Sequence, residues 1–385
     1  MTSRSEPQPD TDLPARVSTL ELFFDLVFVF TITQLTGMLA RDMTLAAGCR
    51  VLLVFGVLWW MYGGYAWLTN SRTPSRAPER LLLLLGMAGF LVIGLAIPHA
   101  FTPGASGRDG VALGLGFLLV IAVHAGLYLR INRNFQRVLP FNLLSALLVI
   151  VAGLAGGAVI YVLWTAALAV QALSPLLVRL GGRFSIQPAH FVERHGALMI
   201  VAFGESVADV GIGASGQHVT AGVAVSAALG LALTAALWWA FFGTGDDDRA
   251  ESAMTGADPA ERPGLALAAY FYAYIPMLLG IVAMAAGLKL SIGHAGSALT
   301  AAPALALSGG VALFLAGDVL FRHVLRIGTL RYRAAAAALA LACWPVAVAA
   351  NAITGIALLA VLIAAALAAE NALARKDEPL DTFEA

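Results

Sequence analysis

The chain carries twelve apolar stretches, most of them close to the ~20 residues that a helix needs to cross the hydrocarbon core of a membrane. Charged residues make up 12% of the 385 positions, about half the level that is usual in soluble proteins. Mean hydropathy is +0.84. These features predict an all-α, polytopic membrane helix bundle with about 12 transmembrane helices. We place the spans at residues 18–40, 46–69, 80–101, 111–130, 139–155, 157–178, 194–213, 219–243, 264–288, 303–325, 333–350 and 352–370.

The loop charges test this count, because Arg and Lys concentrate in cytoplasmic loops. With twelve spans, both termini fall on one side of the membrane. That side then holds all but four of the 23 Arg and Lys residues. The exceptions are Arg41, Arg50, Arg108 and Lys289. We therefore predict a multi-pass protein of the bacterial plasma membrane with both termini in the cytoplasm.

The spans divide the chain into two halves of six. We assign residues 1–16 to a disordered cytoplasmic N-terminus, 17–178 to the first six-helix half, 179–193 to a cytoplasmic linker, 194–370 to the second six-helix half and 371–385 to a cytoplasmic tail.

Short motifs recur between the halves in the same order. LWW at residues 58–60 returns at 237–239, and IP at 97–98 returns at 275–276. Six spans are an even number, so two copies would insert in the same orientation, related by an axis along the membrane normal. The motifs predict an internal repeat in parallel orientation. The alternative is that short apolar words recur by chance in Ala- and Leu-rich helices.

The first span opens with ELFFDL, which places Glu21 and Asp25 one helical turn apart on one face. A charge near the bilayer centre costs about 3 kcal/mol on insertion scales. Glu21 has a structural explanation, since Ser18 and Glu21 have the spacing of a capping box. Asp25 lies too deep for capping, so it is either a pathway residue or part of a buried polar core.

The seventh span holds the deepest acid. Counted from Arg194, Glu205 lies ~16 Å along the helix at 1.5 Å per residue, near the midplane. A carboxyl group there must be protonated or paired. Arg194, Glu205 and Asp209 share one stripe of the helix, and Gly204 favours close approach by another helix or a ligand. The alternative role for Glu205 is a hydrogen-bonded acid that fixes helix packing.

Other polar features are weaker candidates. His124 in the fourth span is either a proton relay or a hydrogen-bonded core histidine. Asp318 and Arg322, one turn apart, are expected to pair within their helix, and the acidic run 246–248 to form a solvated turn. No zinc, phosphate-loop or nucleophile motif occurs in the sequence, and no basic run indicates nucleic acid. We expect no metal, no cofactor and no nucleic-acid partner.

Two segments carry a family resemblance. VSTLELFFDLVFVFTITQLT (17–36) and ERHGALMIVAFGESV (193–207) resemble the two signature segments of the bacterial low temperature requirement A (LtrA) family, and WLTN (67–70) is similar to a third family position. The family name describes growth in the cold and implies no biochemical activity. Residues of this chain that coincide with the family motifs are Glu21, Asp25, Glu193, Arg194, Gly204, Glu205 and Ser206.

The leading hypothesis is a transporter or channel for a proton, a cation or a small solute. Asp25 and Glu205 would line one pathway at two depths, and Arg194 would supply a countercharge near its inner mouth. Further pathway candidates are Glu21, Asp209 and His124. Two alternatives stay open: a membrane enzyme acting on lipid or isoprenoid substrates, and a non-catalytic scaffold for membrane function in the cold. We favour transport over catalysis. The sequence leaves the substrate and the oligomeric state open, a homo-oligomer included.

Overall fold

The computed structural model describes residues 16–72, 74–101, 107–131, 133–178, 186–294 and 296–377. Within these ranges every regular element is a helix, and there is no strand. The predicted disordered N-terminus, apart from Arg16, and the last residues of the predicted tail lie outside the described residues.

The first half consists of six long helices. They are α1 (Thr19–Arg41), α2 (Leu45–Ser71), α3 (Ala77–Ala96), α4 (Arg108–Tyr128), α5 (Leu139–Leu154) and α6 (Val159–Val178), with the 3₁₀ turns η1 (Ile97–His99) and η2 (Arg133–Arg137) between them.

The second half is less regular. It consists of α7 (Pro188–Ala214), α8 (Ala221–Phe241), α9 (Asp246–Gly256), α10 (Arg262–Ala266), the π-helical segment η3 (Leu267–Tyr272), α11 (Tyr274–Gly293), α12 (Ala301–Leu325), α13 (Arg331–Ala342), α14 (Trp344–Ala349) and α15 (Ala352–Asp377).

The predicted membrane bundle is confirmed. Eleven helical segments of the described chain are long and apolar enough to cross a membrane, and α6 is a shorter apolar helix that accounts for the remaining predicted stretch. Such helices imply a lipid bilayer around the protein. The seventh span begins at Pro188, six residues before the predicted start at Arg194, with proline at a position where it favours helix initiation. This early start brings His190 and Glu193 into the helix.

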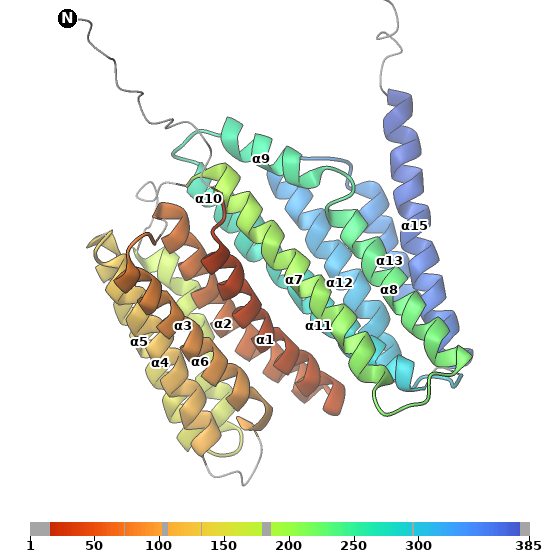
Figure 1. Cartoon of the computed structure of the whole chain (residues 1–385), viewed down its shortest axis with the longest axis horizontal. Helices are drawn as coiled ribbons and strands as arrows, with labels where there is room; N and C mark the ends of the chain where they lie inside the picture. Colours follow the sequence, from red (N-terminus) through yellow and green to blue (C-terminus); the bar gives the residue numbers. More distant parts are fainter. Residues whose placement is uncertain are drawn as a thin grey trace, which may run out of the picture.

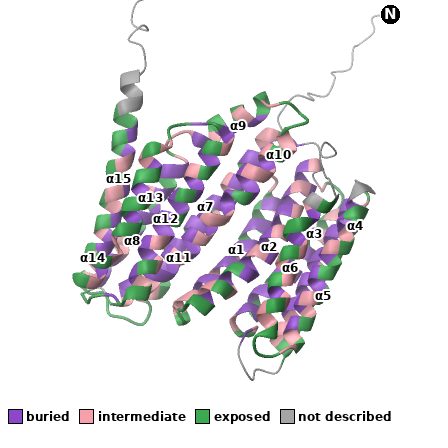
Figure 2. Cartoon of the chain, turned by 180° about the vertical axis from the view of Figure 1, so that it is seen from behind, coloured by how far each residue is buried: buried purple, intermediate pink, exposed green. Residues whose placement is uncertain are grey.

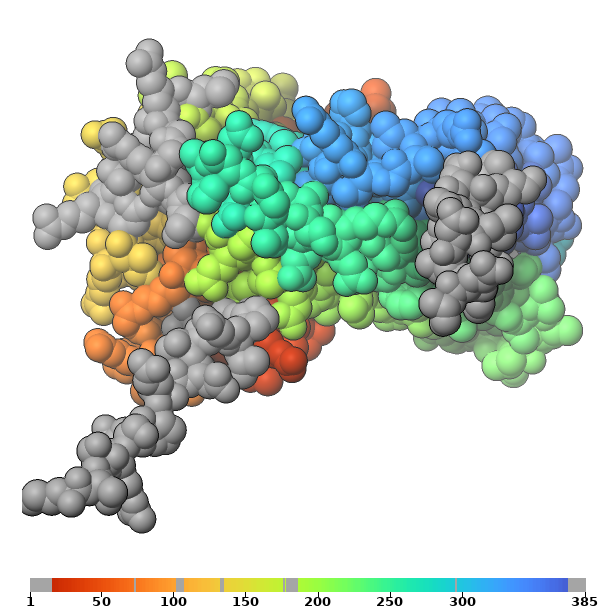
Figure 3. Space-filling model, turned by 90° about the horizontal axis from the view of Figure 1, so that it is seen from above, coloured from red at the N-terminus to blue at the C-terminus, as the bar shows by residue number. Residues whose placement is uncertain are grey.

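The two halves lie side by side (Figure 1). α1 packs against α7 and α11, so the first and seventh spans meet at the junction. α1 begins and α15 ends at the same end of the bundle, which we call the terminal face (Figure 1). Seen onto that face, the halves form one elongated outline (Figure 3). Within the second half, buried residues are most frequent on α11 and α12, where Figure 2 shows them in purple.

Small residues and aromatic rings close the core. A Cβ atom added at Gly310 of α12 would lie only 2.3 Å from the backbone nitrogen of Met284 in α11, so glycine is required for this close helix contact. Trp59 is fully buried at the junction of the halves and donates its indole N–H to the Phe271 carbonyl at 3.0 Å. Its predicted repeat counterpart, Trp238, is 39% exposed. The parallel superposition of the halves stays a prediction.

Candidate functional site

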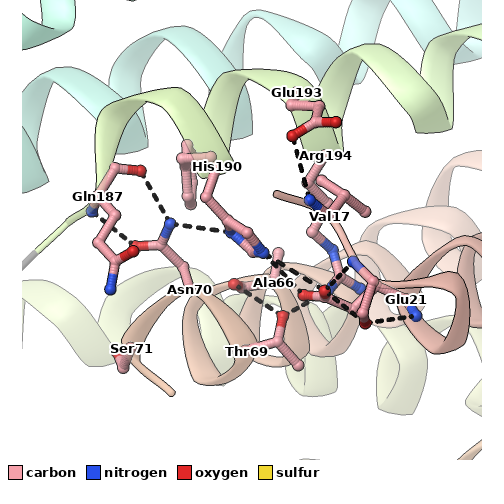
Figure 4. A network of polar contacts seen from close by, with 12 residues as sticks. Val17, Glu21, Ala66, Thr69, Asn70, Ser71, Gln187, His190, Glu193 and Arg194 are labelled. Atoms are coloured by element: carbon pink, nitrogen blue, oxygen red, sulfur yellow. Dashed lines mark hydrogen bonds and ion pairs between the residues drawn. The ribbon is translucent and has the colours of Figure 1, made fainter. Parts of the chain in front are cut away.

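Four charged or titratable side chains meet where α1 and α7 cross near the terminal face, and Figure 4 labels three of them, Glu21, His190 and Arg194. The four are Glu21, Asp25, His190 and Arg194, which we call the inter-half cluster. Each is at most 1% exposed. The carboxylates come from α1 and the two basic residues from α7, so the cluster connects the first half to the second.

Arg194 binds both acids. Its Nη1 lies 2.8 Å from Glu21 Oε1, and its Nη2 lies 3.3 Å from Asp25 Oδ1. Nη1 also donates to the Thr69 hydroxyl of α2. The Tyr62 hydroxyl, also from α2, donates to Asp25 Oδ1 at 2.9 Å. Three helices are thus joined by hydrogen bonds to charged groups, which are about twice as strong as neutral ones.

Glu21 has two roles at once. Its carboxylate completes a capping box with Ser18 at the start of α1, as the sequence predicted. The same carboxylate pairs with Arg194 and His190, whose Nε2 lies 3.2 Å from Glu21 Oε1. The structural explanation for Glu21 is therefore correct but incomplete. Beside it, Glu193 accepts the backbone N–H of Val17 at 3.1 Å, holding the chain entry of α1 against α7.

The hydrogen bonds around His190 fix its protonation. The side chain of Asn70 pairs with the backbone of Gln187, its oxygen accepting from the N–H and its nitrogen donating to the carbonyl, both at 3.0 Å. The same Asn70 nitrogen lies 3.2 Å from His190 Nδ1, which accepts in the tautomer that carries its proton on Nε2. An imidazole that accepts at one nitrogen is neutral and carries its proton on the other. His190 thus donates from Nε2 to Glu21 without adding charge.

The inter-half cluster is consequently one positive charge short. Glu21 and Asp25 face a single guanidinium, and among the described residues only Arg194 and neutral His190 make ion-pair contacts with them. Asp25 Oδ2 and Arg194 Nε are buried and have no hydrogen-bond partner in the described chain. An uncompensated buried charge is costly. A proton on Asp25 or a small cation at its free oxygen would restore balance.

Aromatic rings surround the guanidinium. Arg194 Cζ lies 5.6 Å from the ring centre of Phe24 and 5.8 Å from that of Tyr62, distances at which the ring faces attract a cation. These contacts hold the charge away from water between the halves.

The structure places the deeper pathway candidates apart from this cluster. Asp209 accepts from Lys289 Nζ of α11 at 3.1 Å. Glu205, half-buried one turn earlier, has a buried Oε1 without a partner in the described chain. Gly204 is exposed, and an added Cβ there would meet nothing within 4 Å. No helix of the described chain approaches Gly204 closely, and approach by a ligand stays a prediction.

Two further motif or pathway candidates are buried elsewhere. The Ser206 hydroxyl has no hydrogen-bond partner among the described residues. His124 of α4 lies in an aromatic pocket on the other side of α2 and does not join the inter-half cluster.

A second buried network joins α9, α12, α13 and α15 near the terminal face. We call it the peripheral cluster, and it consists of Asp246, Asp318, Arg322, Arg333 and Glu370. Arg322 lies 2.6 Å from Asp246 and 2.5 Å from Glu370, while Arg333 lies 2.8 Å from Glu370 and 3.0 Å from Asp318.

This network corrects two expectations. Asp246 was predicted in a solvated turn, but it is fully buried because Arg322 and Arg249 pair with it. The predicted Asp318–Arg322 pair within α12 exists at 3.8 Å, yet the closer partner of Asp318 is Arg333.

Sequence reasoning missed the α2 contribution to the site. Tyr62, Thr69 and Asn70 are ordinary residues in a helix, and only the WLTN resemblance at residues 67–70 marked part of this segment. The missed partners Arg333 and Glu370 looked like helix-end charges, and only the fold brings them to Asp318.

Comparison with known proteins agrees with the motif resemblance. The sequence model of the bacterial low temperature requirement A protein (LtrA) family matches residues 16–369. An uncharacterized protein of Rhizobium meliloti (strain 1021) is 28% identical over 329 residues, which cover 79% of this chain and 76% of the relative. No solved structure matches the chain.

Proposed function

The chain belongs to the bacterial low temperature requirement A (LtrA) family, and we propose that it is a transporter or channel in which the inter-half cluster binds the transported proton or small cation. The observation that carries this proposal is the missing positive charge of that cluster. Two buried carboxylates share one guanidinium, and a neutral histidine completes the set.

The charged side chains of the inter-half cluster are buried inside the protein and do not face lipid, which supports a functional role for them. Ionisable groups inside membranes face the bundle interior and mark ion pathways in many pumps and transporters. Here the acids belong to α1 and their counterion to α7. Loading or releasing one positive charge would change the attraction between the two halves, which is the step that alternating access requires.

Glu205 is our candidate for a second step along the same route. It lies eleven residues beyond Arg194 on α7, has an unpartnered buried oxygen within the described chain, and precedes the Asp209–Lys289 pair by one turn. A proton or cation leaving Asp25 would meet this carboxylate deeper in the bundle. Its amide variant, Glu205→Gln, should slow flux while the fold survives.

We place the terminal face in the cytoplasm. The distribution of Arg and Lys supports this orientation through the positive-inside rule. A cytoplasm-specific reporter fused after residue 376 should be active. An active periplasm-specific reporter at that site would reverse the proposed direction of entry.

Flux in proteoliposomes tests the function. The purified full chain is reconstituted with a pH dye inside, and a K⁺ diffusion potential drives H⁺; parallel vesicles report Na⁺ or K⁺ uptake. We expect flux from the wild type and at least a tenfold loss in Asp25→Asn. Asp318→Asn is the matched control, because it removes a buried acid from the peripheral cluster and should retain flux. A wild type that moves none of these ions, or an Asp25→Asn variant with full flux, would refute the proposal.

A further inference from the structure

A cavity of about 420 Å³ lies on the side of α2 away from the inter-half cluster. Its volume falls within the range of small-molecule sites, ~300–1,000 Å³. Residues from α2, α4 and α5 form one wall, and residues of α10 and the π-helical segment form the other, so both halves contribute. Its principal lining residues are Trp60, Trp67, His124, Tyr128, Phe271 and Tyr272.

His124 is the chemically unusual member of this lining. It is 2% exposed, and neither ring nitrogen makes a hydrogen bond of good geometry in the described chain, where the Gly64 backbone is its nearest polar partner. Its ring stacks on Tyr128 at 5.3 Å and meets Phe135 edge-on at 4.9 Å. Leaving a buried polar group unpaired costs about 1–3 kcal/mol. A ligand with a hydrogen-bonding group would remove that cost.

Glycine lets α2 approach this histidine closely. A Cβ atom added at Gly64 would lie 3.1 Å from His124 Nε2, and Gly64 itself lines the cavity. A larger residue at this position would crowd Nε2. The nitrogen is buried, so a ligand in the cavity reaches it through a small rotation of the histidine ring.

The residues that line the cavity restrict the charge and the shape of a ligand that could bind there. No Asp, Glu, Lys or Arg is among the described lining residues, so the cavity offers nothing to balance an ion. Its walls are aromatic rings, which prefer offset or edge-on contact with another flat ring. The π-helical segment contributes Leu267, Phe271 and Tyr272, and π-bulges occur frequently at functional sites.

From these observations we propose that the cavity binds a neutral, lipid-soluble molecule with a planar ring and a ring oxygen, the chemistry of a quinone head group. His124 Nε2 hydrogen-bonds the oxygen, and the aromatic walls contact the ring. The membrane supplies the ligand through the rim, where Tyr272 is 43% exposed. This site is separate from the inter-half cluster and does not rest on the transport proposal.

Tryptophan fluorescence gives a direct readout, because Trp60 and Trp67 lie in the wall and quinones quench indole emission. Purified full-length protein in detergent is titrated with ubiquinone that carries one isoprene unit. We expect saturable quenching. Dodecanol, which is apolar but has no ring, should not displace the quinone.

Three variants locate the binding. His124→Phe keeps a planar ring and removes both nitrogens, so affinity should fall about tenfold for one lost hydrogen bond. Gly264→Leu adds a side chain at an exposed lining position where a Cβ meets nothing within 4 Å, so it should fold and weaken binding at least tenfold. Gly126→Leu, on the exposed side of α4, is the matched control and should bind within about twofold of wild type.

Quenching that rises without saturation, or that is equal in all four proteins, would mean partition into the micelle and would overturn the proposal. Equal displacement by dodecanol would overturn recognition of the ring. If His124→Phe does not fold, Gly264→Leu against Gly126→Leu still decides whether the cavity is the site.

Discussion

The two buried charge clusters lie near the same face of the bundle but differ in their charge balance. In the peripheral cluster, Asp246, Asp318 and Glu370 face Arg322 and Arg333, and the half-exposed Arg249 adds a third guanidinium at 3.0 Å from Asp246. Protein side chains neutralise it completely. In the inter-half cluster, two carboxylates share Arg194. Each cluster retains a buried carboxylate oxygen without a partner in the described chain, Asp318 Oδ1 in one and Asp25 Oδ2 in the other. The difference lies in the charges, which balance in the peripheral cluster and leave the inter-half cluster one positive charge short.

The two clusters also differ in whether the helices that they join belong to one half or to both. The peripheral cluster ties together α9, α12, α13 and α15, all within the second half. The inter-half cluster ties α1 and α2 to α7, across the junction of the halves. A balanced network inside one half stabilises that half. An unbalanced network between halves can respond to a proton or cation, which is why we assign function to the second and stability to the first.

The largest loss of stability is expected from Arg322→Gln. This change leaves Asp246 without its closest partner and removes one of two guanidiniums from Glu370. Breaking a buried ion pair from one side typically costs about 3–5 kcal/mol. Thermal unfolding in detergent, followed by tryptophan emission, measures the effect. Arg326→Gln, four residues later and exposed, is the control and should change little. Equal midpoints for the two variants would contradict a structural role for the peripheral cluster.

Arg194→Gln should have the next largest effect, about 3 kcal/mol, because it leaves Glu21 and Asp25 without a guanidinium partner. The charge deficit of this cluster also predicts the behaviour of a double variant. Adding Asp25→Asn to Arg194→Gln removes one of the two unpaired carboxylate charges, so the double variant should recover part of the lost stability. A double-mutant cycle on thermal midpoints measures this coupling. Strictly additive losses would show that Asp25 does not carry the excess charge.

The sequence predicts the fold more completely than the site, for a physical reason. Span length and loop charge depend on the local sequence and the membrane, so the twelve stretches could be found without any contact information. Motif positions likewise led to Glu21, Asp25 and Arg194, which the structure brings together. The seventh span was predicted to start at Arg194, but the helix begins at Pro188. His190 and Arg194 of this segment are buried by partners on α1 and α2, whereas Glu193 is exposed.

Contacts between distant helices could not be predicted. Asp246 looked like a solvated acid because its partner Arg322 follows 76 residues later. Gly204 looked like a packing contact because glycine often marks one, yet its surroundings are open. The charge deficit itself depends on Asn70, which makes His190 neutral through the backbone of Gln187. No periodicity or motif reports such a chain of hydrogen bonds.

The smallest effect on stability, and the most informative, is expected from Asp25→Asn. The amide keeps an oxygen for the Tyr62 hydroxyl, and its loss of charge leaves Glu21 and Arg194 as a balanced pair. We therefore expect a change below about 1 kcal/mol. The same substitution at Asp318 removes a charge from a balanced network and weakens the hydrogen bond from Arg333, which should cost about 1.5–3 kcal/mol. Thermal midpoints of the two variants, measured side by side, test the comparison directly. If Asp25→Asn is destabilised as much as Asp318→Asn, both clusters hold helices together and the excess charge of the first has no functional meaning.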